Sequence, residues 1–267
     1  MADAAPLAAS VDARLPTPGA APEVRVGVRR LELGGRLLFE NLSFRLEAGR
    51  WTCLLGSSGV GKTSLLRLIA GLLPGALVST DGGGGLEGRV ALMAQADLLL
   101  PWLSALDNAL LGHRLRGTPR PELRRLRERA RALLARVGLE EREDDLPAAL
   151  SGGMRQRVAL ARTLLEDRPV VLMDEPFSAL DAVTRFRLQD LAAETLAGRT
   201  VLLVTHSPAE AVRLGHRLYV LGGSPARPRG PLAPRGAPPR DPADPAALAL
   251  EAELLRDLIA AAPNGRA

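Results

Sequence analysis

A glycine-rich stretch at residues 56–63, with the sequence Gly-Ser-Ser-Gly-Val-Gly-Lys-Thr, constrains the fold more than any other part of the chain. It follows the apolar run 51–55 and precedes the amphipathic run 64–70. A strand, a loop with this glycine spacing and a helix, in this order, form the pattern of a phosphate-binding loop. The backbone N–H groups of such a loop, and the N-terminus of the helix that follows, point at a polyphosphate.

The lysine of this stretch, Lys62, is the only lysine in a chain that has 34 arginines. An ammonium is compact and carries its charge at one point, so it suits the β- and γ-phosphates better than a planar guanidinium does. The hydroxyl of Thr63 is suited to ligate magnesium. These features favour a phosphate-binding loop over a chance glycine-rich turn.

Composition and charge exclude several classes of protein. The net charge of +5 is small for 267 residues, and only seven residues are aromatic, which favours a solvated arginine-rich surface over a nucleic-acid-binding one. Cys53 is the single cysteine, so we expect neither a disulfide framework nor a cysteine-based metal cluster. No apolar run reaches the roughly 18 residues of a membrane span, and the first residues do not resemble a signal peptide. Any work at a membrane is therefore expected to depend on a partner.

Strand-like and helix-like segments alternate along the chain, which predicts an open α/β sheet. Strands are expected at 24–28, 39–46, 51–55, 89–93, 170–173 and 200–205. Helices are expected at 64–70, 121–137, 151–166, 185–197 and 208–214. Outside this core we expect a disordered lead-in at 1–22, a Pro-rich linker at 222–246 and a C-terminal amphipathic helix at 247–262 that packs or self-associates.

The helix that begins near Pro121 has an apolar stripe and an opposite face rich in arginine. The arginines of that face are Arg124, Arg125, Arg127, Arg129 and Arg131. Nucleic-acid contact is one interpretation of this face. A solvated face balanced by Glu122 and Glu128 is the favoured one.

An acidic pair, Asp174 and Glu175, follows the apolar run 170–173. A strand of this composition is typical of a parallel sheet buried on both sides, so the pair is expected at the carboxyl edge, where α/β folds bind ligands. Asp174 would anchor magnesium directly or through water, and Glu175 would hold and deprotonate the attacking water. Simple helix capping is the alternative. The phosphate-binding loop upstream favours the catalytic interpretation.

Several short stretches, taken in order, resemble the ATP-binding-cassette (ABC) ATPases. They are the phosphate-binding loop, Gln95, the Leu-Ser-Gly-Gly-Met-Arg-Gln stretch at 150–156, the Val-Leu-Met-Asp-Glu-Pro stretch at 171–176, the Ser-Ala-Leu-Asp stretch at 178–181, and His206. The resemblance implies an ABC ATPase domain over 23–221. Its fold is an α/β P-loop NTPase (RecA-like) core with a small antiparallel β subdomain and a helical subdomain inserted at about 97–155.

The resemblance also implies a role for each matching residue. The ATP-binding residues are Gly56, Ser57, Ser58, Gly59, Val60, Gly61, Lys62, Thr63 and Ser64, and the catalytic residues are Glu175, His206, Gln95 and Lys62. Magnesium would be held by Thr63, Gln95 and Asp174. In this family two cassettes dimerise head to tail, so the signature residues Ser151, Gly152, Gly153 and Gln156 would contact the ATP of a second copy. Asp181 would lie at the seam between the two sites. His113 and His216 match no motif.

One departure from the family concerns adenine. An aromatic residue usually stacks on the base, but its slot falls near Leu33, and residues 24–38 contain no aromatic side chain. Either Leu33 or Arg36 covers the base, or adenine is held loosely, which costs about 1–3 kcal/mol of stacking energy.

A single cassette without a membrane segment resembles the separate ATPase subunit of an importer. Downstream of Gln95, Trp102 is either a core residue or an anchor for a membrane permease. The sequence of this segment resembles that of the ATPase subunits of nitrate, sulfonate and taurine importers, and most closely those of importers for the thiamine precursor hydroxymethylpyrimidine. The expected partners are a second copy, an integral membrane permease and, indirectly, a solute-binding protein, with no nucleic acid. The expected location is the cytoplasmic face of the membrane. The alternative function is a soluble ABC-type ATPase acting in regulation or nucleic-acid remodelling.

Overall fold

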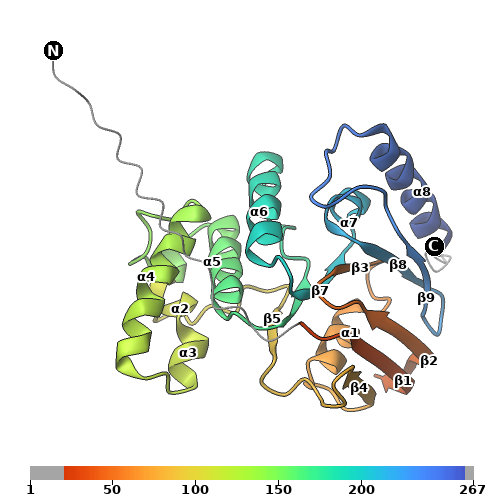
Figure 1. Ribbon diagram of the computed structural model, residues 1–267, viewed down its shortest axis with the longest axis horizontal. Helices are drawn as coiled ribbons and strands as arrows, with labels where there is room; N and C mark the ends of the chain where they lie inside the picture. Colours follow the sequence, from red (N-terminus) through yellow and green to blue (C-terminus); the bar gives the residue numbers. More distant parts are fainter. Residues whose placement is uncertain (1–20, 262–267) are drawn as a thin grey trace.

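The computed structural model describes residues 21–261 (Figure 1). The expected lead-in at 1–22 therefore lies almost entirely outside the described residues, as does the last residue of the expected C-terminal helix. The described chain forms a six-stranded sheet in the order β5-β6-β7-β3-β8-β9 and a three-stranded sheet in the order β2-β1-β4. Helices cover the larger sheet, and a group of helices extends to one side.

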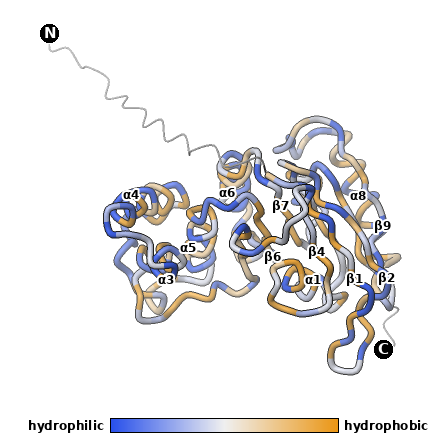
Figure 2. The backbone as a smooth tube through the Cα atoms, turned by 60° about the horizontal axis from the view of Figure 1, so that its bottom comes forward, coloured by the Kyte–Doolittle hydropathy of each residue, from blue (hydrophilic) through white to orange (hydrophobic). Residues whose placement is uncertain are grey.

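The centre of the larger sheet consists of strands that are buried on both faces. They are β3 (Trp51–Gly56), β6 (Val170–Asp174) and β7 (Thr200–Thr205), and every residue in them is buried. β5 (Val90–Met93) and β8 (Arg217–Gly222) flank them, and all five strands are parallel. Complete burial explains why these strands appear in the sequence as continuous apolar runs. Figure 2 shows the hydrophobic character of this part of the chain.

The smaller sheet is antiparallel and confirms the predicted β subdomain. It consists of β1 (Val24–Leu33), β2 (Arg36–Leu46) and β4 (Ala76–Thr80). Buried and exposed residues alternate along β1 because one face of the sheet packs on the core. β4 was not predicted, since its alternating five-residue run lies beside a glycine-rich turn.

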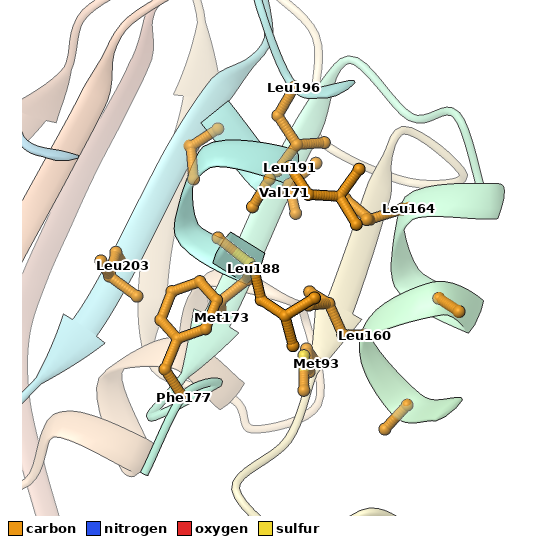
Figure 3. Packing of buried hydrophobic residues seen from close by; sticks show 14 of the residues in the cluster. Met93, Leu160, Leu164, Val171, Met173, Phe177, Leu188, Leu191, Leu196 and Leu203 are labelled. Carbon is orange, nitrogen blue, oxygen red and sulfur yellow. The ribbon is translucent and has the colours of Figure 1, made fainter. Parts of the chain in front are cut away.

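The helices form two groups. α1 (Lys62–Ile69), α6 (Ala182–Thr195), α7 (Pro208–Leu214) and α8 (Pro245–Ala261) pack beside the sheets. The second group corresponds to the expected helical insertion and consists of α2 (Ala105–Ala109), α3 (Leu111–Leu115), α4 (Arg120–Arg136), a short 3₁₀ helix η1 (Pro147–Ala149) and α5 (Gly152–Leu165). α5 joins this group to the core, because its apolar side packs with α6 against the sheet (Figure 3). The residues labelled there are Met93, Leu160, Leu164, Val171, Met173, Phe177, Leu188, Leu191, Leu196 and Leu203.

The Pro-rich stretch 222–246 differs from the linker that we expected. It contains β9 (Arg227–Leu232), which pairs antiparallel with β8 at the edge of the larger sheet. An edge strand has one side without ladder partners, so it tolerates prolines that a central strand would not. Proline content alone therefore does not distinguish this edge strand from a linker.

Arg240 anchors the remainder of this stretch to the core. Its side chain is 6% exposed, and its guanidinium donates hydrogen bonds to five backbone carbonyls. Two of these belong to Val212 (2.7 Å) and Gly215 (2.8 Å), at the C-terminal end of α7. The other three belong to Pro234, Arg235 and Gly236. A cation at a helix C-terminus is favourable because the free carbonyls there are partially negative.

We expect the substitution Arg240→Met to lower the free energy of unfolding by about 3 kcal/mol, because it leaves buried carbonyls without donors. Chemical denaturation monitored by circular dichroism measures this change. Arg235→Met is the matched control, since that side chain is exposed and lies in the same stretch. Equal effects of the two substitutions would contradict the anchoring role of Arg240.

Candidate functional site

The glycine-rich loop connects the end of β3 to the start of α1, as the sequence predicts. Gly61 has a φ of 107°, and a Cβ atom there would lie 2.7 Å from the ring of Phe39. A Cβ at Gly56 would lie 2.8 Å from the carbonyl oxygen of Leu221. Both positions therefore require glycine, for conformation in one case and for close packing in both.

The side chain of Lys62 folds back onto the first residues of this loop. Its Nζ donates hydrogen bonds to the carbonyl oxygens of Gly56 (2.7 Å) and Ser57 (3.0 Å). Burial lowers the pKa of the ammonium, while the carboxylates Glu175 and Asp174 oppose that shift. A cavity of about 390 Å³ adjoins it. Its lining residues are Leu38, Ser58, Gly59, Gly61, Lys62, Thr63, Ser64, Gln95 and Glu175.

Thr63 and Asp174 meet although 111 positions separate them in the sequence. The Oγ1 of Thr63 donates a 2.7 Å hydrogen bond to Oδ2 of Asp174, the last residue of β6. Burial raises the pKa of the Asp174 carboxyl, and the hydrogen bond from Thr63 opposes this. A hydroxyl and one carboxylate are oxygen ligands of the kind that Mg²⁺ uses together with substrate phosphates. In residues 21–261, no group of three or more His, Cys, Asp or Glu side chains forms a separate metal cluster.

Glu175 lies between Gln95 and His206. Its Oε2 accepts a hydrogen bond from Nε2 of Gln95 at 3.4 Å and lies 3.2 Å from Nδ1 of His206. The backbone of Glu175 has a φ of 49°, a conformation that few residues other than glycine adopt. Its N–H donates to the carbonyl of Val204 at 2.9 Å, and Ser178 Oγ donates to its carbonyl at 3.0 Å. These bonds hold the carboxylate at the edge of the cavity that Lys62 lines.

The signature residues begin α5 and do not line the cavity. Ser151 is exposed and caps the helix, with its Oγ accepting a 3.3 Å hydrogen bond from the N–H of Met154. Gly152 is exposed, and a Cβ at Gly153 would lie 3.1 Å from the carbonyl oxygen of Ala179. The N-terminus of α5 therefore presents N–H groups at a surface rather than toward the chain's own loop.

Gln156, which was predicted as a signature residue, is buried within its own chain. It is 5% exposed, and its Nε2 donates to the carbonyl of Pro176 in the same chain at 3.2 Å. It lies one turn into α5, so its side chain points inward while Ser151 and Gly152 lie at the helix end. Its contacts support the loop that carries Glu175.

Asp181 caps α6, with Oδ1 accepting a 3.0 Å hydrogen bond from the N–H of Thr184. This bond lowers the pKa of the exposed Asp181 carboxyl. His216 lies elsewhere: its Nδ1 accepts a 3.0 Å hydrogen bond from the N–H of Trp51, and burial lowers its pKa to about 4. His113 contacts the carbonyl of Leu165 at 3.3 Å. Neither histidine lines the cavity.

Two residues near the site, Leu38 and Glu210, were not predicted. Leu38 lines the cavity because it alternates along β2 with the buried Phe39. Leu33 and Arg36 are the two residues that were expected near the adenine base. Leu33, at the end of β1, is 40% exposed, and Nη1 of Arg36 donates to the carbonyl of Gly59 at 3.5 Å. Glu210 on α7 is buried behind His206, where its Oε2 accepts a 2.7 Å hydrogen bond from Thr205 Oγ1. Burial raises the pKa of Glu210. Period-two alternation in β2 would have identified Leu38, but no local signal marks Glu210.

Known proteins are similar to this chain in both sequence and fold. The family model described as "ABC transporter" matches residues 39–178. An "Uncharacterized ABC transporter ATP-binding protein" of Haemophilus influenzae is 42% identical over 88% of this chain and 98% of its own length. The "Aliphatic sulfonates import ATP-binding protein SsuB 1" of Rhodococcus jostii is 47% identical over 73% of this chain and 79% of its own length. A second protein named for aliphatic sulfonates import, from Burkholderia cenocepacia, is 38% identical over 90% of this chain and 89% of its own.

A solved structure, the ATP-binding cassette MJ0796 in a dimeric post-hydrolysis state bound to ADP and Pi, matches with a TM-score of 0.70 and 27% identity. The match covers 80% of this chain and 99% of that one. Of the helices between residues 21 and 261, none combines the length and the hydropathy of a membrane span. The family match, the relatives and the shared fold agree with the phosphate-binding loop and the carboxylates beside it. The chain therefore belongs to the ABC transporter family, as one of its ATP-binding and ATP-hydrolysing proteins.

Proposed function

We propose that this chain is the ATPase subunit of an ABC importer whose solute is an aliphatic sulfonate or a similar small organic anion. The names of the relatives support an aliphatic sulfonate as the solute. The sequence after Gln95 instead favours hydroxymethylpyrimidine. The incomplete site supports the part of the proposal in which two copies act together. The cavity is lined by the phosphate-binding loop and Glu175 but by none of the signature residues.

Each residue of the cavity has a distinct role in this proposal. Lys62 and the N–H groups of the loop bind the β- and γ-phosphates. Glu175 takes the proton of the attacking water, and His206, 3.2 Å from its carboxylate, senses the γ-phosphate. Gln95 donates to the same carboxylate and so links it to the segment that follows β5. Thr63, Asp174 and Gln95 would hold Mg²⁺, which neutralises charge on the phosphates when it is bound.

A second copy completes the site. Ser151, Gly152 and Gly153 of that copy would meet the γ-phosphate through the N-terminus of α5, which is a favourable place for an anion. Asp181, exposed at the start of α6, would lie at the seam between the copies. Opening of this seam after hydrolysis would release the products.

A membrane permease would bind the segment that follows Gln95. Trp102 is 70% exposed, so it is not a core residue, and Leu98 in the same segment is 63% exposed. The side chain of Asn108 fixes this segment: its Oδ1 accepts from the N–H of Leu100 at 2.8 Å, and its Nδ2 donates to the carbonyl of Leu103 at 2.9 Å. An exposed tryptophan on a fixed segment is a good anchor for a protein partner. The permease would hold the subunit at the cytoplasmic face and connect it indirectly to a solute-binding protein.

Solute uptake tests this proposal. Deleting the gene should reduce uptake of labelled alkanesulfonate to background and leave sulfate uptake unchanged. Wild-type protein should restore uptake, whereas Trp102→Ala should restore it about 30-fold less well, because an interface tryptophan contributes about 2 kcal/mol or more. Leu77→Ala is the control, since Leu77 is 77% exposed but lies on β4. If uptake of hydroxymethylpyrimidine falls instead, the sulfonate proposal is wrong while the ATPase role stands.

A further inference from the structure

The net charge of the chain is concentrated on one helix. α4 contains seven arginines and two glutamates, an excess of five positive charges over 17 residues. The whole chain has 35 basic and 30 acidic residues, which is the same excess. The basic and acidic residues outside α4 are therefore equal in number. α4 lies at the outer edge of the helical group, on the opposite side of the molecule from α8 (Figure 1).

Three of the arginines of α4 have acidic partners. Arg131 pairs with Glu128 (2.9 Å) and Glu143 (3.0 Å), and Arg136 pairs with Glu194 (2.6 Å). The third, Arg127, lies 3.6 Å from Asp107. Among the described residues, four arginines of α4 form no ion pair and no side-chain hydrogen bond. These four, which we call the α4 basic face, are Arg120, Arg124, Arg125 and Arg129.

The α4 basic face is electrostatically unfavourable for the helix itself. Arg120 and Arg124 are four residues apart, as are Arg125 and Arg129, so like charges are neighbours on the helix surface. Arg120 is the first residue of α4, where the helix dipole disfavours a cation. Glu122 is the only acidic residue of the first turn. A charge arrangement that opposes local stability and has no partner within the described chain indicates an anion outside it.

The chemistry of the surface favours a membrane over a nucleic acid. α4 has no aromatic residue on which a base could stack. Leu115, at the end of α3 just before α4, is 78% exposed, and apolar residues beside basic ones are typical of membrane-surface segments. Hydrophobic and hydrophilic segments alternate along α4 in Figure 2, as in an amphipathic helix. Clusters of four or more arginines on such a helix attract acidic lipids.

We propose that the α4 basic face binds anionic phospholipid headgroups directly, in addition to the contact that a permease would make. This contact is electrostatic, so it needs neither nucleotide nor permease and weakens with salt. It would orient the helical group against the membrane. The inference extends the proposed function, which brings the chain to a membrane through a protein partner only.

Vesicle flotation of the purified full-length chain tests the proposal without permease or nucleotide. Wild-type protein should float with phosphatidylcholine vesicles that contain about 30% phosphatidylglycerol, but not with pure phosphatidylcholine, and should be released at about 0.5 M NaCl. The variant R120Q/R124Q/R125Q/R129Q should bind at least about 100-fold more weakly. Its ATPase activity and melting temperature should not fall, because the substitutions relieve repulsion and lie outside the cavity.

The control variant R187Q/R227Q/R229Q/R235Q changes the net charge by the same amount at exposed arginines outside α4, and it should still float. Equal loss of binding in both variants, or equal binding of wild type to both vesicles, would overturn the proposal. So would retention on RNA or DNA that depends on the α4 basic face in the absence of vesicle binding. A chain that floats as expected but imports another solute would contradict the proposed function alone.

Discussion

Replacing Glu175 with glutamine is expected to lower ATP turnover by about 100- to 10,000-fold while ATP binding persists. Glutamine has nearly the same size as glutamate, so the positions of Gln95 and His206 around it should be kept. An amide cannot take a proton from water, however, and the Glu175 carboxylate borders the cavity that Lys62 lines. Steady-state phosphate release measures turnover, and fluorescent nucleotide titration measures binding.

Glu194→Gln is a suitable control for this experiment, because that carboxylate is 70% exposed and pairs with Arg136 far from the cavity. It removes one negative charge without touching the loop that begins at Glu175. A Glu175→Gln protein that hydrolyses ATP at close to the wild-type rate would remove Glu175 from the role of general base.

Replacing Ser151 with arginine is expected to reduce hydrolysis to background without weakening nucleotide binding to a single copy. Ser151 does not line the chain's own cavity, so the phosphate-binding loop should be unaffected. A long cationic side chain at the exposed start of α5 would block the approach of a second copy. Turnover and nucleotide affinity are measured as for Glu175→Gln, and size-exclusion chromatography with ATP reports dimer formation.

Loss of the helix cap must be separated from loss of the shared site, because removing a capping serine costs about 1 kcal/mol. Ser104→Arg removes an equivalent cap, since Ser104 Oγ accepts from the N–H of Asp107 at 3.2 Å at the start of α2. This control should keep its ATPase activity. A Ser151→Arg protein that dimerises and turns over normally would contradict the shared site.

Mixing the two inactive proteins gives a direct test of sharing between copies. Ser151→Arg has an intact Glu175, and Glu175→Gln has an intact Ser151. A mixed dimer has one Ser151→Arg side chain at the seam instead of two, so it should form more readily than a dimer of Ser151→Arg alone. One of its two sites would combine both intact residues, so the mixture should regain partial activity. If each chain contained a complete site, the mixture would remain inactive.

The sequence predicted correctly the features that depend on neighbouring residues. Complete burial makes β6 and β7 continuous apolar runs, and steric requirements at Gly56 and Gly61 make the phosphate-binding loop recognisable. Edge strands have weaker signals. The prolines of β9 predict a linker, but an edge strand tolerates them because one of its sides lacks ladder partners. β4, at the edge of the smaller sheet, was not predicted either. β8 was not predicted although it is an interior strand with a buried apolar run, so burial alone did not make it recognisable.

The sequence by itself determined the nucleotide chemistry, because Lys62, Thr63 and the acidic pair after β6 follow local rules of loop, helix and strand. Only the tertiary structure decided how distant residues meet. It brought Thr63 within 2.7 Å of Asp174, turned Gln156 toward its own chain and exposed Trp102. It also showed that Arg240 is buried among carbonyls and that the first arginines of α4 lack acidic partners among the described residues. Local patterns specify backbone conformation, whereas burial and pairing arise only when segments far apart in the sequence pack together.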